Sequence, residues 1–319
     1  MVTPLESYLA DKARVSVSGI SAGAFMAHQL HIAYSDVFMG AGLIAGGPYM
    51  SSQGSLFGAL AHGLHGMPPP DHRQLSRVAS SLAAMGAIAS TSNLAKSRVW
   101  MFHGKRDTTV KRQVSDSLAL FYKRYLDKDA LCYVNTVDVV HAMPTNHYGL
   151  LPSNAPESPY IVNCNYDAAG AMLTHIYGAL APRVDELGGK LVEFDQRPFL
   201  GGASGHSMDK TGFMYLPSAA LAGKKCGVHV ALHGCKQSRE TIGDIFATST
   251  GYNEWAESND LIVLYPQAAA TTSMGLFNPL GSWDWWSYTG QDYALRSGRQ
   301  MKAIYEMVTC LTSSAVNAK

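Results

Sequence analysis

The sequence has almost no excess charge of either sign and no long apolar run. Its 25 Lys and Arg residues balance 24 Asp and Glu residues, for a formal net charge of +1. A charge so close to zero argues against binding to nucleic acid or to an anionic membrane surface. The sequence contains no run of about 18 apolar residues, so it predicts no transmembrane helix.

Cysteines are scarce. The 319 residues contain five, an odd number that leaves at least one unpaired, and no C-x-x-C occurs. Cys226 and Cys235 bracket one predicted strand, whose extended length of roughly 30 Å prevents them from bridging each other. The N-terminus lacks the basic and apolar regions of a signal peptide. We therefore expect either a cytosolic protein or one whose leader has been removed, and the cysteine count leaves both open.

Short apolar strands alternate with helical patterns along the chain, of which 47% is hydrophobic. This alternation is typical of a mostly parallel, doubly wound α/β sheet. We expect one domain over 1–319, with a first half over 1–181, a connector over 182–227 that is polar and Gly-rich up to 212 with some β structure, and a second half over 228–319. Strands are predicted near 14–18, 42–46, 98–104, 132–137, 228–235 and 261–266, helices near 23–34, 75–89, 111–126, 166–180, 241–257 and 293–311, and irregular structure over 51–75.

A strand, a sharp turn and a helix follow one another at the start of the chain. The turn reads Gly19-Ile20-Ser21-Ala22-Gly23, the G-x-S-x-G pattern of a nucleophile elbow. A serine exposed at the tip of a strand has a strained backbone and needs neighbours almost without side chains. The first amides of the following helix suit a developing negative charge at the same place. Because the pattern also arises by chance in Gly-rich chains, the alternative is a glycine-rich turn that caps a helix.

Asp107 and His141 lie on loops that follow predicted strands. With Ser21 they stand in the chain order Ser, Asp, His that α/β-hydrolases use, and the carboxyl ends of parallel strands line one crevice. His141 would take the serine proton as general base, and Asp107 would hold the imidazole tautomer. Taken singly, the aspartate also fits a turn residue and the histidine a surface residue. Three other histidines are rival bases, namely His103, His147 and His233.

The element that fits the second oxyanion donor lies far downstream. One donor is the amide after the nucleophile, here Ala22, and the other normally follows an upstream strand with an H-G loop. Only one strand fits before Ser21, yet Leu232-His233-Gly234-Cys235 has this form and precedes a helix and another strand. A circular permutation explains the order, with the original ends joined through 182–212. The alternative is that His233-Gly234 is an ordinary strand end.

With these motifs, the chain resembles the single-domain poly(3-hydroxybutyrate) depolymerases, circularly permuted α/β-hydrolases related to feruloyl and acetyl esterases. The resemblance implies a serine esterase without a cofactor. It also implies the triad Ser21, Asp107 and His141, and an oxyanion hole formed by the amides of Ala22 and Cys235. The matching stretches are Val17–Gly23, Ala45–Tyr49, Asp107–Val110, His141–Thr145, Ser158–Asp167, Ala231–Cys235, Leu264–Gln267 and Trp283–Trp285.

The expected partner is a polyester or oligoester. The resemblance places Trp285 beside it, and Trp283 and Tyr49 are further predicted contacts, although core packing is the alternative for the tryptophans. Two related enzyme functions stay open, an esterase for feruloyl or acetyl esters and one for synthetic polyesters. A catalytically silent polyester-binding protein is the third alternative.

Secreted members of the family usually have cysteines at positions where this chain has Met50-Ser51 and Ser282. Cys235 is therefore expected to be a free thiol, which weakens the inference of an oxidising compartment. The resemblance still predicts an extracellular or periplasmic protein, and a cytoplasmic one is the alternative.

Two histidine pairs have spacings that could ligate a metal, His28 with His31 and His62 with His65. No carboxylate nearby completes either set, so surface or interior histidines are the better interpretation and no metal is expected. Gly40-x-Gly42 resembles a nucleotide fingerprint only faintly, because it lies in the wrong structural context.

Overall fold

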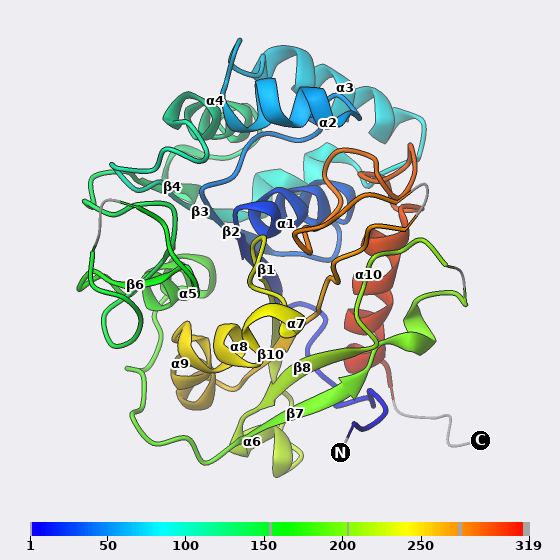
Figure 1. Ribbon diagram of the computed structural model, residues 1–319. Helices are drawn as coiled ribbons and strands as arrows, with labels where there is room; N and C mark the ends of the chain where they lie inside the picture. Colours follow the sequence, from blue (N-terminus) through cyan, green and yellow to red (C-terminus); the bar gives the residue numbers. More distant parts are fainter. Residues whose placement is uncertain (1, 153–154, 203, 274–275, 315–319) are drawn as a thin grey trace.

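The computed structural model describes residues 2–152, 155–202, 204–273 and 276–314. An eight-stranded sheet in the order β4-β3-β2-β1-β9-β10-β8-β7 runs through the molecule (Figure 1). Neighbouring strands from β4 to β10 are parallel, and β8 and β7 continue the sheet in antiparallel fashion. The predicted α/β class with a mostly parallel sheet is confirmed.

The strands of this sheet are β1 (Val15–Ile20), β2 (Gly40–Ile44), β3 (Arg98–Phe102), β4 (Leu131–Val134), β7 (Lys190–Asp195), β8 (Thr211–Leu216), β9 (Gly227–Leu232) and β10 (Leu261–Tyr265), and β5 (Met143–Thr145) with β6 (Ile161–Asn163) forms a second, small sheet. The α-helices are α1 (Ala22–Ala33), α2 (Leu56–Gly58), α3 (His72–Ala84), α4 (Arg112–Tyr122), α5 (Ala168–Tyr177), α6 (Ser218–Leu221), α7 (Arg239–Ile242), α8 (Ile245–Ser249), α9 (Tyr252–Asn259) and α10 (Arg299–Thr312). A π-helix, η1 (Ala59–Leu64), continues α2, and the 3-10 turns are η2 (Thr91–Lys96), η3 (Lys128–Ala130) and η4 (Arg197–Phe199).

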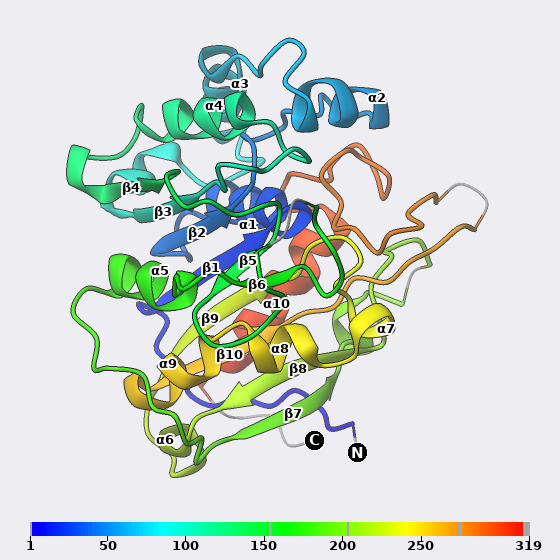
Figure 2. The same ribbon diagram turned by 60° about the vertical axis from the view of Figure 1, so that its left-hand side comes forward.

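The central strands β1, β2, β9 and β10 are buried along their whole length. Helices cover both faces of such a sheet, which is why these strands are rich in branched apolar residues. Helix α1 packs on β1, β2 and β9, while α5 packs on β2 and β3 and α9 on β10. Figure 2 shows α5, α8 and α9 gathered together, apart from the group of α2, α3 and α4 at the top. No described helix has the length and hydropathy of a membrane span.

The pairing of β1 with β9 brings the downstream motif to Ser21. The register joins Gly19 to Leu232, so the residues two positions further along each strand lie side by side. A Cβ built on Gly234 would stand 3.3 Å from the Cβ of Ser21. Strand β10 pairs with the other edge of β9. This arrangement is the one that the circular permutation requires, and the permutation itself stays a prediction.

Several predicted boundaries are wrong. The segment 51–75, predicted to be irregular, contains α2, η1 and the start of α3. The helix predicted over 241–257 is three short helices, because glycines with positive φ, Gly243 (65°) and Gly251 (88°), separate them. The last helix begins at Arg299 rather than near 293.

The segment 182–227, predicted as a connector with some β structure, contributes β7 and β8 to the main sheet. The region after β4, predicted as a loop, contains β5, which pairs with β6. Strand β5 has only three residues, too few for an apolar pattern to identify it from sequence. Strands β7 and β8 have six residues each and were predicted only as unspecified β structure.

Candidate active site

Ser21 adopts the strained backbone expected of a nucleophile elbow. Its φ and ψ are 56° and −124°, a backbone conformation that residues other than glycine rarely adopt. The flanking glycines are needed because a Cβ on Gly19 would lie 2.2 Å from the carbonyl oxygen of Gly23. The hydroxyl of Ser21 makes no capping hydrogen bond to α1, although the residue occupies the N-cap position. The alternative of a simple capping turn therefore does not describe this serine.

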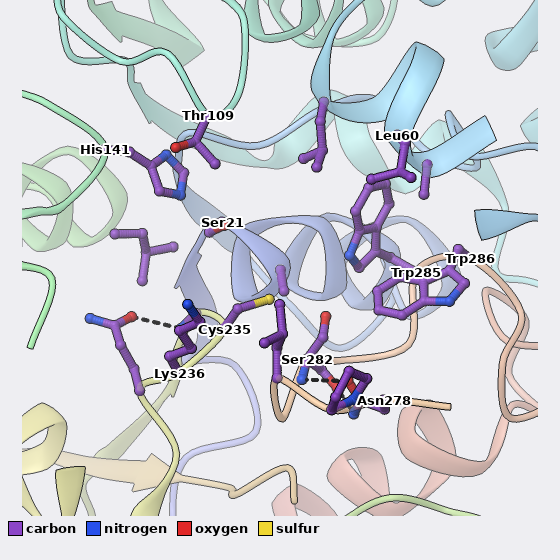
Figure 3. Close-up of a pocket in the computed structure, with 18 of the residues that line it drawn as sticks. Ser21, Leu60, Thr109, His141, Cys235, Lys236, Asn278, Ser282, Trp285 and Trp286 are labelled. Carbon is purple, nitrogen blue, oxygen red and sulfur yellow. Dashed lines mark hydrogen bonds between the residues drawn. The ribbon is translucent and has the colours of Figure 1, made fainter. Parts of the chain in front are cut away.

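Asp107 and His141 form a buried acid–base pair. The Nδ1 atom of His141 lies 2.7 Å from Oδ2 of Asp107. The other carboxylate oxygen accepts the amides of Thr109 at 2.9 Å and Val110 at 3.0 Å. Because the carboxylate is an acceptor, Nδ1 carries the proton, which leaves Nε2 of His141 as an acceptor. Ser21 and His141 line the same cavity, and Figure 3 draws both toward one end of it.

The pKa of Asp107 is lowered despite burial. Burial by itself would raise it, but the charge and the hydrogen bond of His141, the charge of His103 and the amide of Val110 outweigh burial. The carboxylate is therefore ionised at neutral pH. An ionised Asp107 can stabilise His141 when that ring becomes positively charged.

None of the rival histidines lines the cavity. His103 donates from Nε2 to the carbonyl of Val110 at 2.9 Å. His233 is engaged at both nitrogens: Nε2 accepts the amide of Ala268 and Nδ1 donates to the carbonyl of Gly234. Burial lowers the pKa of His233 to about 4. His147 lies beside Arg183, with Nδ1 at 3.2 Å from the guanidinium. Of these four histidines, only His141 lines the cavity.

The turn after β9 contains a backbone amide that has no hydrogen-bond partner among the described residues. The amide of Gly234 donates to Oε1 of Gln237 at 2.8 Å, that of Lys236 to the carbonyl of Leu280 at 2.9 Å, and that of Gln237 to the carbonyl of Gly234 at 3.3 Å. Within the described ranges, the amide of Cys235 donates to no carbonyl or side chain. Ala22 is the first residue of α1, whose leading amides have no partner within the helix. The predicted oxyanion donors, Ala22 and Cys235, both line the cavity.

The cavity is mostly apolar, with a volume of about 520 Å³. That volume falls within the range of small-molecule sites, roughly 300–1,000 Å³. One wall comes from α2 and η1, with Leu56, Leu60 and Leu64, and another from Phe277 and Leu280. In Figure 3 the indole rings of Trp285 and Trp286 are drawn at the end opposite His141. The cavity therefore combines the hydroxyl of Ser21 and the imidazole of His141 with largely apolar walls.

Trp285 is positioned by packing on its ring faces and edges. Its ring stacks on Phe25 of α1, with centroids 4.0 Å apart, and meets Trp286 edge to face at 5.4 Å. A Cβ on Gly63 would lie 2.4 Å from the indole, so glycine makes room for the ring there. Trp285 lines the cavity, and its contact with a substrate stays a prediction.

Trp283 and Tyr49 were expected to contact the substrate, but neither lines the cavity. They are 0% and 1% exposed, respectively. The indole of Trp283 donates to the carbonyl of His233 at 3.0 Å, and the hydroxyl of Tyr49 donates to the carbonyl of Ala294 at 2.7 Å. We therefore correct the prediction and assign both side chains to core packing, where Trp283 supports the turn after β9.

Asp284 organises the aromatic loop, a role that sequence reasoning missed. Its carboxylate accepts the amides of Trp286, Tyr288 and Thr289 and the hydroxyl of Thr289. Burial raises its pKa in spite of these hydrogen bonds. The signal in the sequence was an aspartate between tryptophans, a residue that commonly bonds the backbone just ahead of it in turns.

The described residues contain no group of three or more His, Cys, Asp or Glu side chains that could hold a metal ion. His28 and His31 are interior residues of α1, and burial lowers the pKa of each to about 3. His31 bonds the hydroxyls of Tyr122 and Ser97. His62 is partly exposed and donates to the carbonyl of Pro68.

All five cysteines are free thiols. Burial raises the pKa of Cys235, and its hydrogen bond with Ser282 opposes that rise. The contact with a serine in place of a cysteine agrees with the expectation that Cys235 is unpaired.

No family model matches the chain. Curated proteins do. The chain is 39% identical over 310 residues to a poly(3-hydroxybutyrate) depolymerase of Delftia acidovorans, covering 95% of this chain and 60% of that protein. It is 37% identical over 324 residues to a polyhydroxybutyrate depolymerase of Talaromyces funiculosus, covering 98% and 93% respectively. A shorter match, 38% over 106 residues, is to poly(3-hydroxyalkanoate) depolymerase C of Paucimonas lemoignei, with 31% and 22% covered. The chain thus spans about three fifths of the Delftia protein's length and nearly all of the Talaromyces protein's.

Solved structures that resemble this chain are also polyhydroxybutyrate (PHB) depolymerases. The crystal structure of PHB depolymerase from Penicillium funiculosum superposes with a TM-score of 0.89 at 37% identity, covering 97% of this chain and 99% of that one. A serine-to-alanine variant of PHB depolymerase complexed with R3HB trimer matches with the same TM-score of 0.89 and the same coverage, at 36% identity.

Proposed function

The chain belongs to the polyhydroxybutyrate depolymerase family of α/β-hydrolases, and from this membership we propose that it hydrolyses poly(3-hydroxybutyrate) or a related aliphatic polyester. One observation carries the proposal. Ser21, Ala22, His141 and Cys235 all line one largely apolar cavity, and Asp107 is hydrogen-bonded to His141.

The reaction follows from these positions. Nε2 of His141 takes the proton as Oγ of Ser21 attacks the ester carbonyl. The negative charge that develops on the carbonyl oxygen is stabilised by the amides of Ala22 and Cys235. His141 then returns the proton to the departing hydroxyl oxygen of the next unit, which leaves an acyl-enzyme on Ser21. A water molecule, activated by the same histidine, releases the acid.

The substrate assignment rests on the chemistry of the walls. An aliphatic polyester offers methyl groups and ester carbonyls, which suit a largely apolar cavity that is lined by Trp285 and closed by leucines. The structure matched here that carries R3HB trimer supports an oligoester as the ligand of this chain. No step of the reaction calls for a cofactor.

The test is product analysis after incubation with amorphous polyhydroxybutyrate. We expect release of hydroxybutyrate or its short oligomers, and a loss of roughly 10⁶-fold in Ser21→Ala if the triad acts as a unit. Undiminished hydrolysis by the Ser21→Ala variant would reject Ser21 as the nucleophile. Initial rates on a hydroxybutyrate trimer and on methyl ferulate separate a polyesterase from a feruloyl esterase. Failure of a fluorophosphonate probe to label wild-type protein would indicate the catalytically silent alternative.

We further propose that the protein is one domain over 1–319 and acts outside the cytoplasm. Family membership supports the second point, whereas the five free thiols support the cytoplasmic alternative. Fractionation of the native host, followed by detection of the protein in each fraction, decides between them.

A further inference from the structure

We propose that Gln237 is a positioning residue that sets the oxyanion donor Cys235 and the loop of the base His141 relative to each other. The proposal rests on the function given above, because it concerns the same Ser21 chemistry. Gln237 touches neither reacting atom in the mechanism. Its side chain is 1% exposed and borders the cavity.

On one side, Gln237 holds the turn that contains the oxyanion donor. The side-chain oxygen Oε1 of Gln237 accepts the backbone amide of Gly234 at 2.8 Å, and the backbone amide of Gln237 donates to the carbonyl of Gly234 at 3.3 Å. That carbonyl also accepts Nδ1 of His233 at 2.8 Å. The peptide groups on either side of Gly234 are thus fixed, and the second of them, between Gly234 and Cys235, carries the donor amide of Cys235.

On the other side, Gln237 reaches the segment that supports the base. Its Nε2 donates to the carbonyl of Pro159 at 2.9 Å and to that of Tyr160 at 3.3 Å. The carbonyl of Tyr160 also accepts the amide of Met143 at 2.8 Å, two residues beyond His141. Strand β5, which starts at Met143, pairs there with β6. One side chain therefore links the turn after β9 to the loop that carries the base.

Only a primary amide fits this position. The group must accept from one N–H and donate to two carbonyls, which fixes the orientation of the Gln237 amide. A glutamate has the same shape but would set a carboxylate oxygen against two carbonyl oxygens. A methionine fills similar space and bonds to none of the three groups.

Another glutamine provides a matched control. Gln196 is 0% exposed, accepts the amide of Gln267 at 3.0 Å, and donates to the carbonyls of Asp209 at 2.7 Å and Gln267 at 3.1 Å. It makes the same set of bonds as Gln237 but does not line the cavity. Gln196→Glu therefore makes the same change in hydrogen bonding at a residue outside the cavity lining.

The experiment measures kcat and KM on p-nitrophenyl butyrate for Gln237→Glu, Gln237→Met and Gln196→Glu, each normalised to active sites by fluorophosphonate titration. Thermal unfolding is measured for each protein, together with inhibition by an alkyl boronic acid, whose adduct with serine resembles the tetrahedral intermediate. A displaced oxyanion donor should lower kcat by roughly 10- to 100-fold in both Gln237 variants. KM should stay within about threefold, and the boronate inhibition constant should rise by a factor similar to the loss in kcat.

A Gln237 variant that is less stable but keeps wild-type kcat per active site, as expected of Gln196→Glu, would overturn the proposal. So would a fall in kcat with unchanged boronate affinity, because the donor geometry would then be intact. Wild-type protein that hydrolyses no ester would instead reject the function on which the proposal rests.

Discussion

Replacing Gly23 by alanine adds one methyl group, which is expected to move the proposed nucleophile Ser21 away from the proposed oxyanion donor Cys235. Gly23 lies in the first turn of α1, against the end of β9. A Cβ there would stand 2.3 Å from the carbonyl oxygen of Leu232 and 2.5 Å from that of His233. Both obstacles are backbone atoms, so no side-chain rotation can relieve the contact.

The size of the effect follows from these distances. Ordinary contacts of a Cβ begin at 3.4 Å, so the helix and the strand end must move apart by about 1 Å. Ser21 directly precedes α1 and is expected to move with the helix, whereas Cys235 follows β9 and is expected to move with the end of that strand. A displacement of about 1 Å between catalytic groups can cost roughly 10²-fold in rate. Overpacking of this kind also lowers the free energy of unfolding by about 1–3 kcal/mol.

The assay is kcat per titrated active site on p-nitrophenyl butyrate, with thermal unfolding measured in parallel. Gly40→Ala is the matched control, since its Cβ would lie 2.4 Å from the carbonyl oxygen of Arg98 and 2.9 Å from Ile176, and none of these residues lines the cavity. We expect both variants to lose stability, but only Gly23→Ala to lose about two orders of magnitude in kcat. If Gly23→Ala kept kcat within threefold of wild type, the close approach of β9 to the elbow would not be what positions the oxyanion donor.

Substitutions at three further residues have distinct expected outcomes. Asp107→Asn should lower kcat by roughly 10⁴-fold through the wrong His141 tautomer. Since the folded-state pKa of Asp107 is lowered, its ionised form adds stability above the pKa of the unfolded carboxyl, and this is lost as pH falls through the folded value. Acid unfolding of the variant should therefore be less steep than that of wild type, and an unchanged curve would contradict this. Trp285→Ala should raise KM for a hydroxybutyrate trimer and cost about 3–5 kcal/mol in the free energy of unfolding, because its stacking on Phe25 is lost; an unchanged KM would remove the residue from the substrate site. Of the described residues that line the cavity, Lys236 alone carries a fixed charge. Wild type should hydrolyse the hydroxybutyrate trimer with a free carboxylate faster than its methyl ester, and Lys236→Met should reduce this rate ratio by about threefold at low salt. Lys236→Arg keeps the charge and should retain the ratio. Equal ratios in all three proteins would show that Lys236 does not attract the carboxylate.

The elbow and the proposed triad could be predicted from the sequence, and for the elbow the reason is that its constraints are local. The flanking glycines of Ser21 are demanded by atoms within a few residues, as the 2.2 Å approach of a Gly19 Cβ to Gly23 shows. Asp107 and His141 could be found because parallel strands end on one edge, so loops far apart in the chain converge there. Alternating apolar segments likewise indicated the sheet.

Which aromatic side chains face the cavity could be decided only by tertiary packing. Trp283 and Trp285 are two residues apart and chemically identical, yet one is buried against His233 and the other lines the cavity. The difference comes from Phe25 and Gly63, which belong to segments more than 200 residues away in the chain. The same holds for Gln237, whose partners Pro159 and Tyr160 lie on a distant loop. Residue types and local spacing determined the reacting groups, whereas contacts between remote segments decided their surroundings, because side-chain burial depends on what packs against the chain from elsewhere.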